Sequence, residues 1–147
     1  MPDRVGARSN VALERVGGAA YGEDAFHYFV AVECARARRS KQPVRLLFAS
    51  LEPFPGQPVA LGSASAARLF KGLTLALRGT DVMGWYRQDR VAGAVLSAHG
   101  DGSTSGIDGT AIEQRVGSRL RQCLPSRVAR ALRVHVMELG PRRIRKG

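Results

Sequence analysis

Apolar side chains recur along this chain with two different spacings, and each spacing predicts one kind of element. In three stretches they return every three or four positions, the period of one helix face: residues 24–40, 63–79 and 110–124. Four shorter stretches are apolar on both faces or alternate apolar with polar, as strands do: residues 44–51, 81–86, 91–97 and 132–139. The predicted order is therefore α-β-α-β-β-α-β.

That order predicts the fold class. After the first helix it follows the split βαβ pattern of ferredoxin-like α+β domains. We expect a ferredoxin-like, nucleotide cyclase-like antiparallel sheet with the helices on one face, and residues 44–51 and 91–96 as its central strands. RNA-binding modules and nucleotide cyclases both use such folds, so the function has to come from individual sites.

The apolar positions of each helix form a stripe that should face the sheet. Asp24 is the expected N-cap of the first helix. The three stripes are Phe26, Phe29, Val30, Cys34 and Ala37; Ala66, Leu69, Phe70, Leu73 and Leu77; and Ile112, Val116, Leu120 and Cys123. Residues 81–86 and 91–97 are close enough in sequence for an antiparallel hairpin, with its turn at Arg87, Gln88, Asp89 and Arg90.

Length and composition favour one domain with two tails. The 147 residues suffice for one core, and we assign residues 1–23 to a flexible arm, 24–139 to the domain and 140–147 to a basic tail. No apolar run approaches the roughly 20 residues of a membrane-spanning helix, so we expect no membrane insertion and a cytoplasmic location. Cys34 and Cys123 lack metal or redox spacing, which predicts reduced structural thiols.

The net charge of +11, from 23 Lys and Arg against 12 Asp and Glu, favours anionic partners. Nucleotides, nucleic acid and acidic protein surfaces all meet that description. An RNA-binding module is the less favoured reading, because such modules present two or three stacking aromatic residues on their central strands. Residues 91–97 have none, and residues 44–51 have only Phe48.

Two segments resemble the GGDEF domains, which make or sense cyclic di-GMP. The first, ECARARRSKQPVRLLFASLEPF, is similar to the family pattern E-x-x-RARR-x-x-x-P followed by an apolar strand and D-x-D-x-F. In the second, RGTD at residues 78–81 precedes the hairpin at the usual interval, so that RQDRV at residues 87–91 occupies the GGDEF positions. The resemblance implies the same α+β fold over residues 24–138.

The departures from the family pattern imply that catalysis is lost. In the family, carboxylates at the positions of Ser50, Glu52 and Arg90 hold the metal ions of phosphoryl transfer. Arg87 and Gln88 replace the two glycines that admit the guanine nucleotide, and Asp89 and Val91 complete the degenerate motif. We therefore expect no enzyme activity, no catalytic residue, no bound metal and no cofactor.

What the chain retains is Arg78 and Asp81, similar to the R-x-x-D motif that binds cyclic di-GMP in many family members. Arg offers a planar fork of donors and Asp accepts hydrogen bonds from guanine N–H groups, with Arg87 and Arg90 as supporting charges. We predict a cyclic di-GMP receptor that signals by protein interaction. The alternative is a ligand-independent interaction or dimerisation module. The protein partner and homodimerisation stay open, and specific nucleic-acid binding is disfavoured.

Overall fold

A computed structural model describes residues 15–16, 20–77, 81–96 and 109–139. Its strands are β1 (Arg15–Val16), β2 (Ala20–Tyr21), β3 (Val44–Leu51), β4 (Val82–Arg87), β5 (Val91–Leu96) and β6 (Leu132–Leu139). Its helices are α2 (Glu23–Ser40), α3 (Ser63–Ala76), α4 (Gly109–Cys123) and the short α5 (Ser126–Ala129). The seven predicted elements are all present, in the predicted order and within a few residues of the predicted bounds.

The strands form one six-stranded sheet in the order β1-β2-β4-β5-β3-β6. All neighbouring pairs are antiparallel except β2 and β4, which are parallel. Strands β5 and β3 are the two inner strands of the four-stranded part β4-β5-β3-β6, which agrees with the prediction, although in the full sheet the middle pair is β4 and β5. The sheet also includes β1 and β2, which lie within residues 1–23, where a flexible arm was expected. Ala20 in β2 is fully buried.

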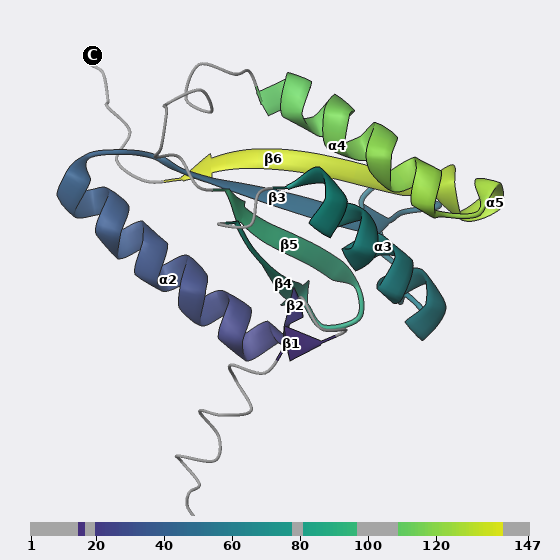
Figure 1. Ribbon diagram of the computed structural model, residues 1–147, viewed down its shortest axis with the longest axis horizontal. Coiled ribbons are helices and arrows are strands. Elements are labelled where there is room, and N and C mark those ends of the chain that lie inside the picture. The colour runs from purple at the N-terminus through teal and green to yellow at the C-terminus, as the bar shows by residue number, and fades with distance from the viewer. Residues whose placement is uncertain (1–14, 17–19, 78–80, 97–108, 140–147) are drawn as a thin grey trace, which may run out of the picture.

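The helices cover both faces of the sheet, which corrects the prediction of helices on one face (Figure 1). On one face the predicted stripes of α3 and α4 pack against Leu47, Ala92 and Leu132. On the other face, α2 packs through Phe26 and Ala37 against a smaller cluster of Val44, Leu46 and Val95. All six residues of β5 are buried, so this central strand needs cover from both sides.

Two glycines make room for α2. Gly84 and Gly93 face each other across β4 and β5, and a Cβ atom on Gly93 would lie 2.8 Å from the ring of Phe26. On Gly84 it would lie 2.6 Å from the Tyr21 carbonyl oxygen. The fully buried Phe26 ring therefore sits against bare backbone, which brings the start of α2 close to the hairpin.

The N-cap of helix α2 lies two residues earlier than predicted, at Gly22 instead of Asp24. Gly22 has no side chain to cap the helix, whereas Asp24 lies in the first turn, where its negative charge interacts favourably with the positive end of the helix dipole.

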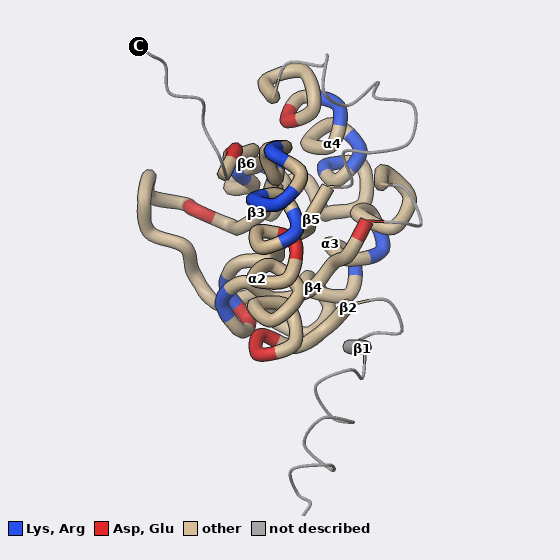
Figure 2. The backbone as a smooth tube through the Cα atoms, turned by 90° about the vertical axis from the view of Figure 1, so that its left-hand side faces the viewer, with Lys and Arg blue, Asp and Glu red and all other residues tan. Residues whose placement is uncertain are grey.

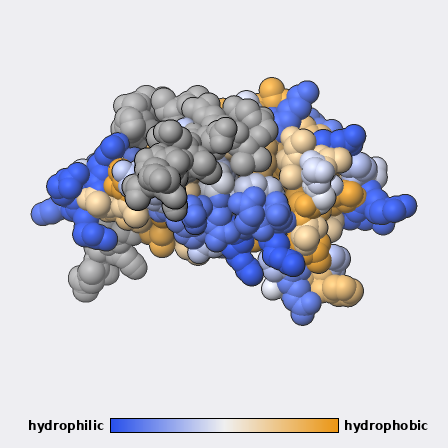
Figure 3. All heavy atoms as spheres, turned by 90° about the horizontal axis from the view of Figure 1, so that it is seen from below, coloured by the Kyte–Doolittle hydropathy of each residue, from blue (hydrophilic) through white to orange (hydrophobic). Residues whose placement is uncertain are grey.

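The face of the molecule seen from below in Figure 3 is mainly hydrophilic. Hydrophilic side chains spread across this surface, and apolar ones form smaller patches between them (Figure 3). Cys34 and Cys123 are free thiols. Within the described residues, no helix is both long and apolar enough to cross a membrane.

Candidate functional site

The β4–β5 hairpin ends in the turn that the sequence analysis singled out, and the hairpin prediction is confirmed. Arg87 ends β4, Gln88, Asp89 and Arg90 form the turn, and all four side chains are exposed. The backbone N–H of Arg90 donates to the Arg87 carbonyl oxygen at 2.9 Å. Asp89 has a φ of 64°, a left-handed conformation that Asp adopts more readily than most residues.

Gln88 joins this turn to the start of helix α2. Its backbone N–H donates to Oε1 of Glu23 at 2.6 Å, and the backbone N–H of Glu23 donates to the side-chain Oε1 of Gln88 at 3.2 Å. The first N–H groups of a helix have no acceptor within the helix, and the N-cap Gly22 offers no side chain. Gln88 therefore acts as the cap of α2, from a position 65 residues away in the sequence.

A second contact between α2 and the hairpin lies beside the first. Nε2 of His27 is 2.6 Å from the carbonyl oxygen of Tyr86, and since a carbonyl only accepts, Nε2 carries the proton. The two rings also stack, with centroids 4.9 Å apart. The strand register shifts between Trp85 and Arg87, so Tyr86 lies in a bulge that turns its carbonyl toward the helix.

The loop between β3 and α3 holds the other side of the turn. The backbone N–H of Leu61 donates to the Asp89 carbonyl oxygen at 2.7 Å. Nη1 of Arg90 donates to the carbonyl oxygen of Pro58 at 3.3 Å. The turn is thus held from two directions, by α2 through Gln88 and by this loop through Asp89 and Arg90.

Ser50 and Glu52, at the family's metal-binding positions, are bonded to each other. Oγ of the buried Ser50 donates to Oε2 of Glu52 at 2.8 Å, and the other oxygen, Oε1, accepts from the backbone N–H of Gly56 at 3.0 Å. Both carboxylate oxygens therefore hold the chain where it leaves β3. Among the described residues, no three His, Cys, Asp or Glu side chains are grouped as metal ligands would be.

An open cleft of about 410 Å³ lies beside these residues, on the same face of the sheet as α2 but beyond the part that α2 covers. Ser50, Glu52 and Val91 reach it from the degenerate motif. Its full lining is Phe48, Ser50, Glu52, Pro58, Val91, Arg133, Val134 and His135. Glu52 is the single acid in that lining, against the cation of Arg133 and the imidazole of His135, so the cleft favours anionic groups over a divalent metal.

The sequence analysis missed the contribution of β6. Arg133 pairs with Ser50, and His135 with Phe48, across β3 and β6, so the period of two puts all four side chains on one face. Nδ1 of His135 is 3.5 Å from Oε2 of Glu113, which also accepts the backbone N–H of Val136 at 2.7 Å. No local pattern in LRVHVMEL predicts that Arg133 and His135 lie beside Ser50 and Phe48, because that placement depends on the register of β6 with β3.

Asp81, the last residue of the R-x-x-D motif, lies at the opposite end of the hairpin from the turn. Arg78 is outside the described residues, and Asp81 is half-buried directly before β4. Val82 pairs with Val95 at one end of the hairpin and Arg87 with Val91 at the other. At about 3.3 Å per residue, roughly 20 Å of strand separates Asp81 from Arg87. The structure therefore places Arg87 and Arg90 at the other end of the hairpin from Asp81, and the prediction that they support ligand binding stays a prediction.

Sequence comparison identifies no relative: no protein-family profile and no curated protein matches this chain. Solved structures do match its fold. The coiled coil and GGDEF domain of DgcB from Caulobacter crescentus, in complex with c-di-GMP, matches with a TM-score of 0.59 at 12% identity, over 95% of this chain and 76% of that one. The FimX GGDEF domain from Pseudomonas aeruginosa gives 0.57 at 15% identity, over 91% and 83% of the two chains.

A third match is diguanylate cyclase SiaD, in complex with its activator SiaC, from Pseudomonas aeruginosa. Its TM-score is 0.57 at 14% identity, over 92% of this chain but 53% of that one, so this chain spans about half of SiaD. Identities this low establish the fold and nothing finer. The chain has the α+β fold of GGDEF domains, as the sequence resemblance implied.

Proposed function

We propose that this chain is a catalytically inactive GGDEF-like domain that binds cyclic di-GMP through Arg78 and Asp81 and signals by protein interaction. The observation that carries the proposal is the hydrogen bonding of the hairpin turn. Gln88 caps α2, the Asp89 carbonyl holds Leu61, and Arg90 bonds to Pro58. In the family that this chain resembles, this turn faces the substrate. Here its hydrogen bonds connect the hairpin to α2 and to the β3–α3 loop.

The side chains at and beside the hairpin turn argue against phosphoryl transfer. Divalent metals in such reactions neutralise phosphate charge and need anionic oxygen ligands. Arg90 brings a cation to a position where the family has an acid, Ser50 brings no charge, and Glu52 already accepts two hydrogen bonds. We infer that the GTP-condensing reaction of the family does not occur at this turn.

Arg78 and Asp81 carry side chains with suitable hydrogen-bonding groups for cyclic di-GMP. The ligand is a dianion with two guanine edges. An Arg guanidinium bonds a phosphate or guanine acceptor in a fork, and a carboxylate accepts from guanine N–H groups. The structure of DgcB, a fold neighbour, contains c-di-GMP, which makes this ligand the first to test here.

A ligand-independent interaction module is the second candidate. Its support is the SiaD structure, in which a protein of this fold is bound to its activator. A domain whose turn serves only to hold its own elements together can act as a scaffold without any nucleotide. The two candidates differ in one measurable property, the affinity for cyclic di-GMP.

Isothermal titration calorimetry with cyclic di-GMP tests the proposal. At about 100 µM ligand, a receptor with a micromolar dissociation constant is nearly saturated, so we expect measurable heat and a raised melting temperature. Neither heat nor a shift at that concentration would end the receptor hypothesis and leave the interaction module in its place.

A further inference from the structure

The outer surface of helices α3 and α4 carries cations without counterions. Arg68 and Lys71 lie on α3, and Arg115 and Arg119 lie on α4; all four side chains are exposed. We call these residues, together with Leu75, the α3–α4 cationic face. Helix α3 contains no acidic residue, and α4 contains only Glu113. Figure 2 shows the resulting run of basic positions along α4, with one acidic position near its start.

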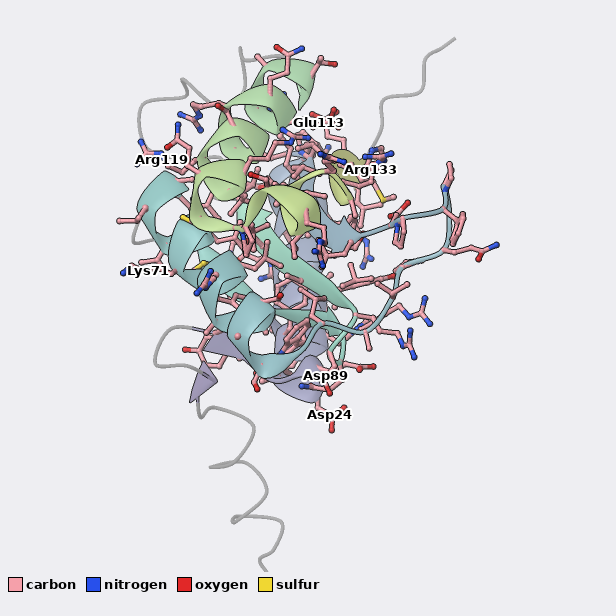
Figure 4. The ribbon with its side chains drawn as sticks, turned by 90° about the vertical axis from the view of Figure 1, so that its right-hand side faces the viewer. Asp24, Lys71, Asp89, Glu113, Arg119 and Arg133 are labelled. Carbon is pink, nitrogen blue, oxygen red and sulfur yellow. The ribbon has the colours of Figure 1, made fainter. Side chains whose placement is uncertain are left out.

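Glu113 does not neutralise this face. Its carboxylate accepts the Val136 N–H and lies 3.5 Å from His135, on the β6 side of the helix. Figure 4 shows Lys71 and Arg119 projecting on one side of the molecule, with Glu113 toward the other and Asp24 and Asp89 at the lower end. Within the described part of the chain, the four cations form no ion pair.

The two helices present one continuous surface. They run in opposite directions (Figure 1) and pack closely, since a Cβ on Gly72 would lie 2.7 Å from Cδ2 of Leu120. Arg115 and Arg119 are four residues apart and Arg68 and Lys71 are three apart, spacings at which like charges on a helix repel. A carboxylate-bearing partner would remove this repulsion by pairing with both rows at once.

The apolar content of the face favours a protein over a nucleic acid. Leu75 is 55% exposed, and it follows Lys71 by four residues on α3, which puts both on one helix face. A peptide side chain can therefore cover it. Single-stranded nucleic acids are held chiefly by stacking on aromatic rings. The aromatic residues beneath this face, Phe70 and Trp85, are buried at 6% and 1% exposure, so no ring is presented to a base.

We propose that the α3–α4 cationic face is the docking surface for an acidic, amphipathic segment of another protein. In the proposed function the chain signals by protein interaction, and the α3–α4 cationic face is the surface that would contact the partner protein. This docking proposal does not depend on cyclic di-GMP, because docking is measured in the absence of that ligand. The two proposals can therefore fail separately.

The test is fluorescence anisotropy with a labelled 20-residue helical peptide, rich in Glu and with one Leu per turn, added to the full chain at low and physiological salt. We expect the Arg115→Glu/Arg119→Glu variant to bind at least tenfold more weakly than the wild type. The matched control is Arg38→Glu/Arg39→Glu on α2, two exposed arginines whose reversal changes the net charge equally; it should lose less than about threefold by long-range field alone. Leu75→Ala should lose about two- to tenfold.

Equal losses in the two reversal variants would overturn the proposal, because net charge alone would then explain binding. A single-stranded oligonucleotide of equal charge that binds as tightly as the peptide, and loses as much in the α4 variant, would overturn it in favour of a general anion surface. Absence of peptide binding by the wild type would also overturn it. Circular dichroism checks the fold, and Arg68→Gln/Lys71→Gln replaces the α4 reversal if that variant does not fold.

Discussion

The two ends of the β4–β5 hairpin differ in the contacts that their residues make. At the turn end, Gln88, Asp89 and Arg90 bond to α2 and to the β3–α3 loop, so the chain uses these residues to hold its own elements together. At the other end, Asp81 enters β4 after Arg78, in a sequence suited to binding a phosphodiester and a guanine edge. About 20 Å of strand separates the two ends.

In the proposed function, this difference means that a site is lost without loss of the fold. In the resembling family, glycines keep the turn open for a nucleotide. Gln88 instead fills that position and supplies the acceptor that Gly22 cannot offer to α2. We propose that this structural hydrogen bond has taken the place of a ligand contact. The opposite end, remote from this change, is where we expect ligand recognition.

Arg78, from the R-x-x-D motif, and Arg87, at the hairpin turn, give the sharpest test of that division. Arg78→Ala should weaken cyclic di-GMP binding by about tenfold to a hundredfold, because it removes charge-assisted hydrogen bonds worth roughly 1.5–3 kcal/mol each. Arg87→Ala, the same chemical change at the turn end, should weaken it by less than about threefold. Calorimetric titration of both variants decides, and equal losses would mean that general charge governs binding.

Asp81→Asn should have a smaller effect on the same affinity, about three- to tenfold, because an amide retains one acceptor oxygen and loses only the charge and the second acceptor. Asp89→Asn at the turn provides the matched control, and its affinity should not change, since the backbone carbonyl of Asp89 makes the bond to Leu61. Asp89→Asn weakening binding more than Asp81→Asn would reverse the assignment of the two ends.

At the turn end the expected effect is on stability. Gln88→Ala removes the acceptor for the Glu23 N–H and should lower the free energy of unfolding by about 1 kcal/mol, the usual cost of a lost helix cap. Urea denaturation measures it, with Gln122→Ala on the exposed face of α4 as control, expected within about 0.5 kcal/mol of wild type. Unchanged stability with weakened cyclic di-GMP binding would make Gln88 a ligand contact instead.

Much of the fold could be predicted because it rests on local periodicity. The stripes of α3 and α4 and the alternation in β6 follow directly from residue spacing, and each faces the core as expected. The two-sided cover of the sheet was missed, although β5 is apolar at every position. A strand without a polar face requires helices on both sides, and that requirement should have placed α2 opposite α3 and α4.

The contacts of the site were less predictable. The resemblance indicated that Ser50, Gln88 and Arg90 depart from the family, but the hydrogen-bond partners of Gln88 and Arg90 are distant in sequence. Glu23 and Gln88 are 65 residues apart, and Arg133 reaches Ser50 only through the register of β3 with β6. Such pairings depend on how elements meet in space, which no local pattern encodes.

The measurement that tests the account most directly is turnover of GTP by the wild type and by Arg90→Glu, with Mg²⁺ or Mn²⁺, and product detection by mass spectrometry. We predict no cyclic di-GMP from either protein. In the variant an acid returns to the position where the resembling family has one, yet Ser50 still supplies no charge and Gln88 still stands where that family has a glycine. Sustained production of cyclic di-GMP by the wild type, absent from a Glu52→Ala control, would show that the turn end is still a working metal site and would contradict the account.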